Sequence, residues 1–377
     1  MELNQKIITY IEDHAQEEQE LLMELAQIPA PSNKEERRAE FCRNWLQVHG
    51  AENVYIDEAL NVVWPIGCQG ENDIAVFMAH SDVVFPDEET LPLTVQDGKI
   101  CCPGVGDDTA NVAALLMAAG YIAREKLQPK DMGVLIVINS GEEGLGNLKG
   151  CRKIMEMYGH RVREFISFDG KDSHCVNKAV GSQRYQVQVT TEGGHSFADF
   201  GKANAIACLA DLIQALYQIR IPDKGKTTYN VGTVSGGTSV NTIAQSARML
   251  YEFRSDERES LAYMERQFLA CVENFRNRGV DISVTLVGSR PCSGQVDADR
   301  MERLMHRASK ANERWYGVPM RFDSGSTDCN IPLSQGIPAV CFGCYYGQGS
   351  HTREEFVWID SLLPGMKLCF EMILHHF

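Results

Sequence analysis

The chain has 377 residues, 44% hydrophobic and 23% charged, which is typical of globular proteins and long enough for two domains. Its formal net charge of -15 disfavours nucleic acid as a partner, because phosphate binding requires a basic face. No run approaches the roughly 20 apolar residues that span a bilayer, so we expect no membrane partner.

The beginning of the chain predicts a helix of the mature protein. Residues 1–22 are acidic and amphipathic, whereas a signal peptide has a basic start and an apolar run. The 13 cysteines favour free thiols and a cytoplasmic location. Cys341 and Cys344 form a CxxC pair, which is either a redox or metal site or two small residues on a buried strand. The second interpretation is favoured, because the chain has no other CxxC.

Short apolar runs alternate with helical patterns in the first half of the chain. Residues 73–80, 133–140 and 163–169 predict buried strands, and residues 109–126 and 148–159 predict helices. Strands that alternate with helices are typical of an α/β fold with a mostly parallel sheet and helices on both faces.

The pattern changes near residue 182. Strands are predicted within 182–193, twice within 227–255 and at 280–288, and helices over 203–219 and 259–279. The order β-α-β-β-α-β is that of a ferredoxin-like unit.

We therefore expect an inserted α+β domain at 182–291. Residues 1–181 and 292–377 would together form the α/β domain. A strand at 337–343 and a final helix near 361–376 complete that domain.

Acidic and imidazole side chains follow the predicted strands of the first domain, and one more, Asp107, lies immediately before the helix predicted at 109–126. The carboxyl ends of parallel strands share one edge of the sheet, and ligand sites form there. Five segments that are distant in sequence are thus expected to meet in one crevice. The side chains concerned are His80, Asp82, Asp107, Glu142, Glu143, Asp169 and His351.

Imidazole and carboxylate groups without cysteine suit Zn²⁺, with Mn²⁺ or Co²⁺ as possible substitutes. So many acids in one crevice would repel one another without cations. Two neighbouring metal ions polarise a carbonyl group and lower the pKa of a shared water, which is a common arrangement for amide hydrolysis.

Five motifs follow one another along the chain: HSD at 80–82, GVGDDTAN at 104–111, SGEEGLG at 140–146, FDGK at 168–171 and GSH at 349–351. In this order they resemble the motifs of the dizinc exopeptidases and deacylases. That family includes carboxypeptidase G, peptidase T, aminoacylase and succinyl-diaminopimelate desuccinylase. The resemblance covers nearly the whole chain, and it implies hydrolysis of a small peptide or of an N-acyl amino acid.

The resemblance implies a zinc-exopeptidase-like fold and a set of metal ligands. His80 and Asp169 would bind one zinc, Glu143 and His351 the other, and Asp107 would bridge both. Asp169 in place of glutamate resembles the aminopeptidase and dipeptidase branches.

Further roles follow from the same resemblance. Asp82 would hydrogen-bond the ring of His80 and select its tautomer. Glu142 would be the general base, taking a proton from water and passing it to the leaving amine. The Asp107–Asp108 peptide bond is expected to be cis.

The inserted domain resembles a dimerisation or lid domain. His195, in TEGGHSF, would stabilise the oxyanion in the partner subunit of a homodimer. Asn241 and Arg254, in SVNT and YEFRS, are candidates for holding a substrate carboxylate, and Gly325 and Ser326 for lining the same pocket.

Simpler interpretations exist for several of these residues. Asp107 and Asp108 could cap the helix that follows them, and Arg254 could form a plain salt bridge on its strand. A non-catalytic dimeric binding protein on the same fold is the alternative from another functional class. A nucleotide site is not expected, because the GxGxxG and GK[ST] spacings are absent.

Overall fold

The computed structural model describes residues 2–377, which form two compact units. Unit 1 combines the chain up to Ala179 with Gly294–Phe377, and unit 2 is Val180–Ser293. The insert expected at 182–291 is two residues shorter at each end than unit 2. No helix of the described residues combines the length and apolarity needed to cross a membrane.

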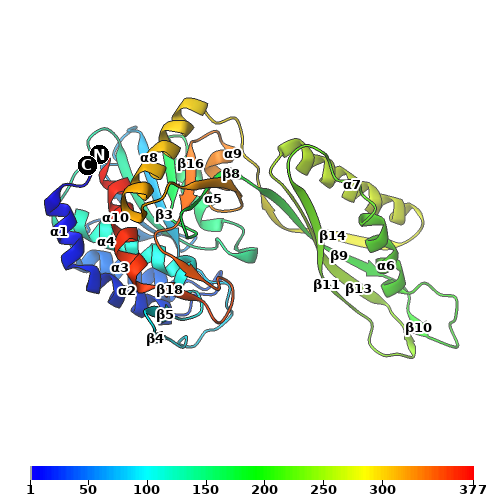
Figure 1. Cartoon of the computed structure of the whole chain (residues 1–377). Coiled ribbons are helices and arrows are strands. Elements are labelled where there is room, and N and C mark those ends of the chain that lie inside the picture. Colours follow the sequence, from blue (N-terminus) through cyan, green and yellow to red (C-terminus); the bar gives the residue numbers. More distant parts are fainter. Residues whose placement is uncertain (1) are drawn as a thin grey trace. The chain divides into compact units, whose positions relative to one another are not determined.

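An eight-stranded mixed sheet lies at the centre of unit 1, as expected for an α/β fold (Figure 1). Its four inner strands, β6, β3, β7 and β16, run parallel to one another. The flanking strands β2 and β8 run antiparallel to their inner neighbours. The strand order is β1 (Tyr55–Ile56), β2 (Val62–Ile66), β6 (Gly133–Asn139), β3 (Ile74–His80), β7 (Val162–Ser167), β16 (Ala339–Phe342), β8 (His174–Ala179) and β15 (Arg321–Gly325).

The central strands separate two hydrophobic cores. Every residue of β3 and β6 is buried. Successive side chains of a strand point to opposite faces, so Phe77 and Ala79 enter one core while Val76 and Met78 enter the other. Burial on both faces explains why these strands are continuous apolar runs in the sequence.

Helices cover both faces of this sheet. Helices α1 to α4, α8 and α10 contribute to the core that contains Phe77, and α5 and α9 to the core that contains Val76. The predicted N-terminal helix is two helices that meet at His14. The helices are α1 (Gln5–Asp13), α2 (Ala15–Gln27), α3 (Glu36–Val48), α4 (Asn111–Arg124), α5 (Lys149–Tyr158), α8 (Ala298–Tyr316), α9 (Asn330–Ser334) and α10 (Leu362–Leu374), with short turns η1 (Val105–Ala110), η2 (Gly144–Gly146) and η3 (Ile359–Ser361).

A second, antiparallel sheet of unit 1 lies beside the segment that contains His351. Its order is β17-β18-β5-β4. His351 lies in the connection between β17 and β18, so this small sheet supports the loop that carries it. The strands are β4 (Thr94–Gln96), β5 (Lys99–Cys101), β17 (Gly347–Gln348) and β18 (Phe356–Trp358).

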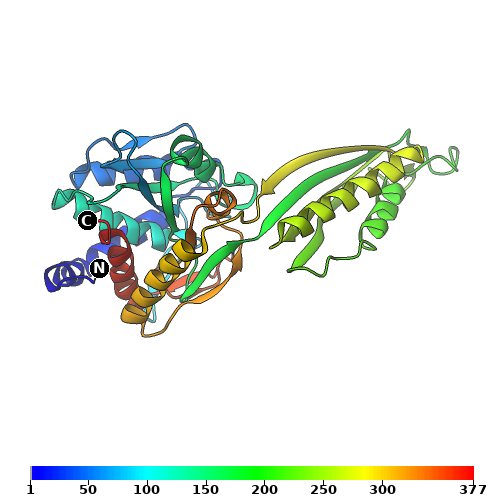
Figure 2. The same ribbon diagram turned by 90° about the horizontal axis from the view of Figure 1, so that it is seen from above.

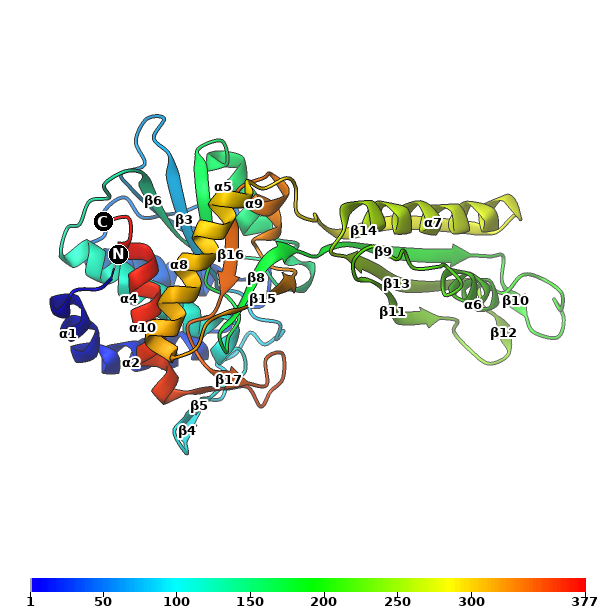
Figure 3. The same cartoon turned by 45° about the horizontal axis from the view of Figure 1, so that its top comes forward.

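Unit 2 has the ferredoxin-like order predicted from the sequence. Its antiparallel sheet has the order β11-β13-β9-β14, and α6 and α7 lie side by side on one face of it (Figures 2 and 3). A separate two-stranded ladder joins β10 to β12. The elements are β9 (Gly181–Thr190), β10 (Gly194–His195), α6 (Ala205–Leu216), β11 (Thr227–Gly236), β12 (Thr242–Ile243), β13 (Ser246–Ser255), α7 (Arg258–Asn277) and β14 (Asp281–Arg290).

Glu18 of α2 is a buried acid in the core of unit 1. Its side chain is 1% exposed, and neither carboxyl oxygen has a hydrogen-bond partner among the described residues. Burial raises the pKa of Glu18 well above its usual value, so the folded chain holds this group protonated. Glu18 therefore lowers stability whenever the unfolded chain can ionise it.

Replacement of Glu18 with methionine is expected to raise the free energy of unfolding by about 1–3 kcal/mol, because it removes two buried polar atoms without partners. The unfolded carboxyl ionises above about pH 4.3. The contribution of Glu18 to the stability of the native chain therefore falls as pH rises above that value, and the advantage of Glu18→Met grows from pH 5 to pH 8. Urea unfolding at both pH values measures this, and an equal difference at both would contradict it.

Candidate metal centre

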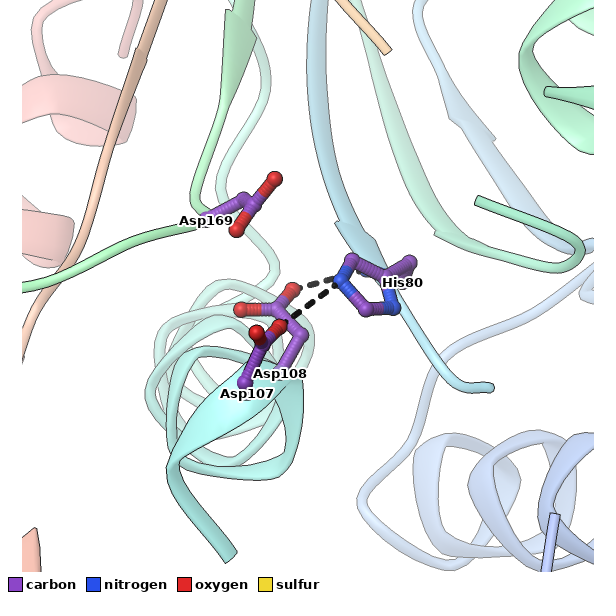
Figure 4. Close-up of side chains that lie close together, drawn as sticks. All are labelled: His80, Asp107, Asp108 and Asp169. Atoms are coloured by element: carbon purple, nitrogen blue, oxygen red, sulfur yellow. Dashed lines mark hydrogen bonds and ion pairs between the residues drawn. The ribbon is translucent and has the colours of Figure 1, made fainter. Parts of the chain in front are cut away.

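The carboxyl edge of the parallel strands brings together the imidazole and acidic groups expected there. His80 ends β3, Glu142 and Glu143 follow β6, and Asp169 follows β7. Ligand atoms of His80, Asp107, Asp108 and Asp169 lie within 4.8 Å of one another. Figure 4 shows these four side chains gathered together. The ligand atoms of two further groups also lie within this distance of one another: His80 with Glu142 and Glu143, and Asp107 with Glu143 and His351.

Asp107 lies between two imidazole rings. Its Oδ1 is 3.3 Å from Nε2 of His80, and its Oδ2 is 3.1 Å from Nε2 of His351. Nε2 of His351 is also 2.9 Å from Oε1 of Glu143. Each oxygen of Asp107 thus faces a different histidine, which is the arrangement needed to share one carboxylate between two cations.

The carboxylate of Asp82 accepts three hydrogen bonds from neighbouring segments. Its Oδ1 and Oδ2 accept hydrogen bonds from the backbone N–H groups of Glu142 and Glu143, each at 3.0 Å, and Oδ2 also accepts one from Ser32 at 2.6 Å. Nδ1 of His80 lies 3.0 Å from the backbone carbonyl of Asp82 and 3.5 Å from its carboxylate. A proton on Nδ1 of His80 therefore forms a hydrogen bond with Asp82, and Nε2 is the ring nitrogen that faces Asp107.

Asp107 lies in the turn η1, whose backbone was only partly predicted from the sequence. The Asp107–Asp108 peptide bond is cis, as the resemblance implied. The carboxylate of Asp108 accepts hydrogen bonds from the backbone N–H of His80 at 2.8 Å and from Nδ2 of Asn111 at 2.6 Å. Asp108 was expected only as a possible helix cap, yet it fastens β3 to the start of α4.

Glu355 is a second supporting acid that sequence reasoning missed. Its side chain is buried, and it accepts hydrogen bonds from the N–H groups of Gly104 at 2.7 Å and Asp107 at 2.8 Å. It follows another glutamate in the sequence REEF, which gives no sign of burial. The β17–β18 segment that carries His351 thus also holds the backbone of Asp107.

The pKa values of the clustered acidic and imidazole groups show that positive charge stabilises the site. Burial raises the pKa of Asp169 to about 6. Hydrogen bonds to Asp107 and Glu143 raise the pKa of His351 to about 10. Burial disfavours the charge on His80, but the Asp108 carboxylate and hydrogen bonds to Asp107 and Asp82 outweigh it and raise its pKa well above the usual value.

Carboxylates held this close repel one another, and protonated imidazoles supply the compensating charge in this arrangement. Divalent cations would supply the same charge. The donor set of two imidazoles and several carboxylates, without cysteine, is appropriate to zinc. The residues present therefore fit a metal centre.

Comparison with known proteins identifies the family. Residues 76–375 match the family described as Peptidase family M20/M25/M40, a range that includes every residue of the metal cluster. The chain belongs to this peptidase family.

Relatives and solved structures agree with that assignment. The acetylornithine deacetylase of Myxococcus xanthus is 29% identical over 326 residues, covering 81% of this chain and 81% of that protein. A tripeptidase from Staphylococcus aureus has a TM-score of 0.76 at 22% identity, covering 95% of this chain and 97% of that one. Aminopeptidase PepT from Bacillus cereus has a TM-score of 0.73 at 21% identity, covering 95% and 98%.

This M20 chain is therefore a hydrolytic enzyme, and its family is metal-dependent. The similarity of the two solved structures, each below 25% identity, shows the shared fold.

In unit 2 of the M20 chain, His195 is exposed at the β10–β12 ladder. Nδ1 of His195 accepts hydrogen bonds from the backbone N–H groups of Phe197 and Ala198, both at 3.3 Å. A neutral ring with this acceptor carries its proton on Nε2, which is then the donor that a ligand can use. Asn241 lies beside this segment, and its carbonyl accepts a hydrogen bond from the N–H of Ser196 at 3.0 Å.

Arg254 lies apart from His195 and Asn241 within unit 2. It is near the end of β13, a strand of ten residues that begins at Ser246, just after the loop with Asn241. Such a strand spans roughly 30 Å. The guanidinium of Arg254 forms two hydrogen bonds of 3.0 Å with Glu252, so the salt bridge considered as the simpler interpretation is present.

Gly325 and Ser326 lie at the carboxyl end of β15 in unit 1. Gly325 pairs with Ala179 of β8, and a Cβ atom on Gly325 would lie 2.6 Å from the side chain of Val176. Glycine is therefore required here by close packing between the strands.

All 13 cysteines are free thiols. Cys341 and Cys344 are buried in different hydrophobic cores, on either side of the central sheet. Both are small core residues, as the favoured interpretation requires, but only Cys341 lies on a strand, because β16 ends at Phe342.

Proposed function

We propose that this M20 enzyme is a two-zinc exopeptidase of the aminopeptidase or dipeptidase type, which cuts an amide bond in a small peptide. The observation that carries the proposal is the position of Asp107, with one oxygen toward His80 and the other toward His351. His80 and Asp169 would hold one zinc, Glu143 and His351 the other, and Asp107 both. Bound zinc ions would polarise the scissile carbonyl and lower the pKa of the attacking water.

Glu142 is the proposed general base. It takes a proton from the attacking water and passes it to the nitrogen of the leaving amine, so that the amide bond breaks without releasing a charged amide anion. Its side chain is only 6% exposed, and its backbone is held by Asp82. Burial of this kind keeps bulk water from competing for the proton.

His195 is proposed to donate Nε2–H to the oxyanion in the active site of a partner subunit. Phe197 and Phe200 beside it are 89% and 90% exposed, and such large apolar side chains favour coverage by a second chain. The distance along β13 supports the same arrangement, because Asn241 and Arg254 of one chain are too far apart to hold one small substrate. In a homodimer, unit 2 would provide the contact surface and the covering lid.

A deacylase acting on N-acyl amino acids is the second candidate. The relative from Myxococcus xanthus, named acetylornithine deacetylase, supports it. The proposed chemistry is the same, since both substrates contain an amide carbonyl and release an amine. Parallel assays with dipeptides and N-acetyl amino acids separate the two.

Removal of the metal is the test of the proposal. The purified chain is expected to carry about two zinc ions, to lose turnover after chelation and dialysis, and to regain it with Zn²⁺, Mn²⁺ or Co²⁺. Mg²⁺ and Ca²⁺ are the matched controls, because these hard cations prefer all-oxygen sites and should not restore turnover. Full activity in a metal-free chain would refute the two-metal mechanism. No bound metal and no turnover with any added ion would favour the non-catalytic binding protein.

A further inference from the structure

Helix α8 of unit 1 carries a row of cations along one face. Their spacing alternates between three and four residues, which places them on a single stripe of the helix. Like charges at this spacing repel, so the row does not stabilise the helix itself. It is also unusual in a chain with 51 acidic and 36 basic residues. The row consists of Arg300, Arg303, Arg307, Lys310 and Arg314.

The row borders a cavity of about 610 Å³. Arg163 and Glu164, at the beginning of β7, also line it. Asp169 of the metal cluster follows the opposite end of β7, so the cavity lies at the amino edge of the sheet, away from that cluster. Pro338, Glu371 and His375 complete much of the wall.

Acidic groups neutralise only part of this charge. Glu164 pairs with Arg307 and with His376, and Glu371 pairs with Arg314. Glu2, the remaining acid of the lining, also pairs with Arg314, at 2.6 Å. All three carboxylates that line the cavity thus form ion pairs with only two arginines of the row, Arg307 and Arg314.

Two of the other cations pair with carboxylates outside the lining, Lys310 with Glu313 at 2.8 Å and Arg163 with Asp73 at 2.9 Å. Arg300 and Arg303 have no carboxylate partner among residues 2–377. Arg303 has no hydrogen bond or ion pair with the rest of residues 2–377, and Arg300 donates to the backbone carbonyl of Arg163. Nε of Arg307 is buried and has no acceptor among the described residues. Burial, together with the positive charges of Arg307 and His376, lowers the pKa of His375 to about 4. The cavity is therefore electropositive and contains hydrogen-bond donors that are available to a ligand.

We propose that this cavity binds a small polyanion with two or more phosphate groups and no nucleobase. Guanidinium forks pair with phosphate oxygens in two places, and several along one stripe can engage neighbouring phosphates. The volume is in the range of small-molecule sites. No Phe, Tyr or Trp is among the described lining residues, so a base would have no such ring to stack on.

Calorimetric titration of the metal-loaded enzyme with pyrophosphate tests this site. We expect one saturable site per chain at the cavity, weaker binding of orthophosphate there, and affinity that falls as NaCl rises from about 50 to 200 mM. The variant Arg303→Glu/Lys310→Glu should bind at least about tenfold more weakly, because both charges are reversed. Arg303→Ala, which removes an unpaired exposed side chain, should also weaken binding and serves if the double variant does not fold.

The matched control is Arg43→Glu/Arg266→Glu, which changes the net charge equally at two positions outside the cavity. It should bind pyrophosphate like the native enzyme. Pyrophosphate can also bind the metal ions, but that heat would be the same in all the variants. Equal binding in the native, cavity and control proteins would overturn the proposal. Tighter binding of ATP or of a short RNA than of tripolyphosphate would overturn the assignment to a small polyanion without a base.

Discussion

Replacement of Glu142 with glutamine is expected to lower kcat by about 10²–10⁴-fold without changing the metal content. The amide has nearly the same shape as the carboxylate but cannot take a proton from water. The backbone N–H of residue 142 would still donate to Asp82, so the loop should keep its position. Steady-state kinetics and metal analysis of the same preparations measure the two quantities.

Glu143→Gln is the matched comparison, because the neighbouring glutamate is hydrogen-bonded to the same Asp82 but faces His351. It should lose metal as well as activity. Loss of metal in Glu142→Gln would make Glu142 a ligand instead of the base. Undiminished turnover in Glu142→Gln would exclude it from both roles.

Replacement of His195 with alanine is expected to lower kcat by about 10²–10³-fold, the usual effect of removing one oxyanion donor. Mixing this variant with Glu142→Gln should restore activity. In a hybrid dimer, the site with intact Glu142 receives intact His195 from the other chain. Half of randomly formed dimers are hybrids, and each has one complete site, so about a quarter of the native activity should return.

The control mixture combines Glu142→Gln with His351→Ala, two changes in unit 1. Each hybrid site then carries a change of its own, so no activity should return. Hybrid dimers without recovery in the first mixture would show that His195 does not act in trans. A fully active monomer in sedimentation experiments would contradict both the dimer and the trans role.

The sheet and the grouping of the candidate ligand residues at its edge could be predicted from the sequence for a physical reason. Strands β3 and β6 are buried on both faces and therefore appear as unbroken apolar runs, and the polar residues that follow them must lie at one sheet edge. The ferredoxin-like order was accessible because β9 and β13 alternate between a buried and a more exposed face.

Other elements gave no comparable signal. Strands β8 and β15, HCVNKA and RFDSG, are short and polar, and β2 contains a proline, so none shows a clear strand pattern. Helix α8 has a narrow apolar face, with small residues such as Ala308 and Ala311 among many charges.

Supporting residues of the site were also hidden, because their roles depend on tertiary contacts. Asp108 and Glu355 are recognisable only when the backbone groups that they bind are in place. For Arg254 the sequence allowed both a substrate-binding role and a plain salt bridge, and only the structure shows that Glu252, two residues away, binds its guanidinium group.

The single carboxylate of Asp82 holds the N–H groups of Glu142 and Glu143 side by side. For protein engineering, this means that the proposed base and the proposed metal ligand beside it cannot be repositioned independently. A redesign for a larger metal ion that moved Glu143 outward would pull Glu142 with it, and proton transfer would suffer along with coordination. New metal specificity would be more readily sought at His351, which reaches the cluster from the separate β17–β18 segment.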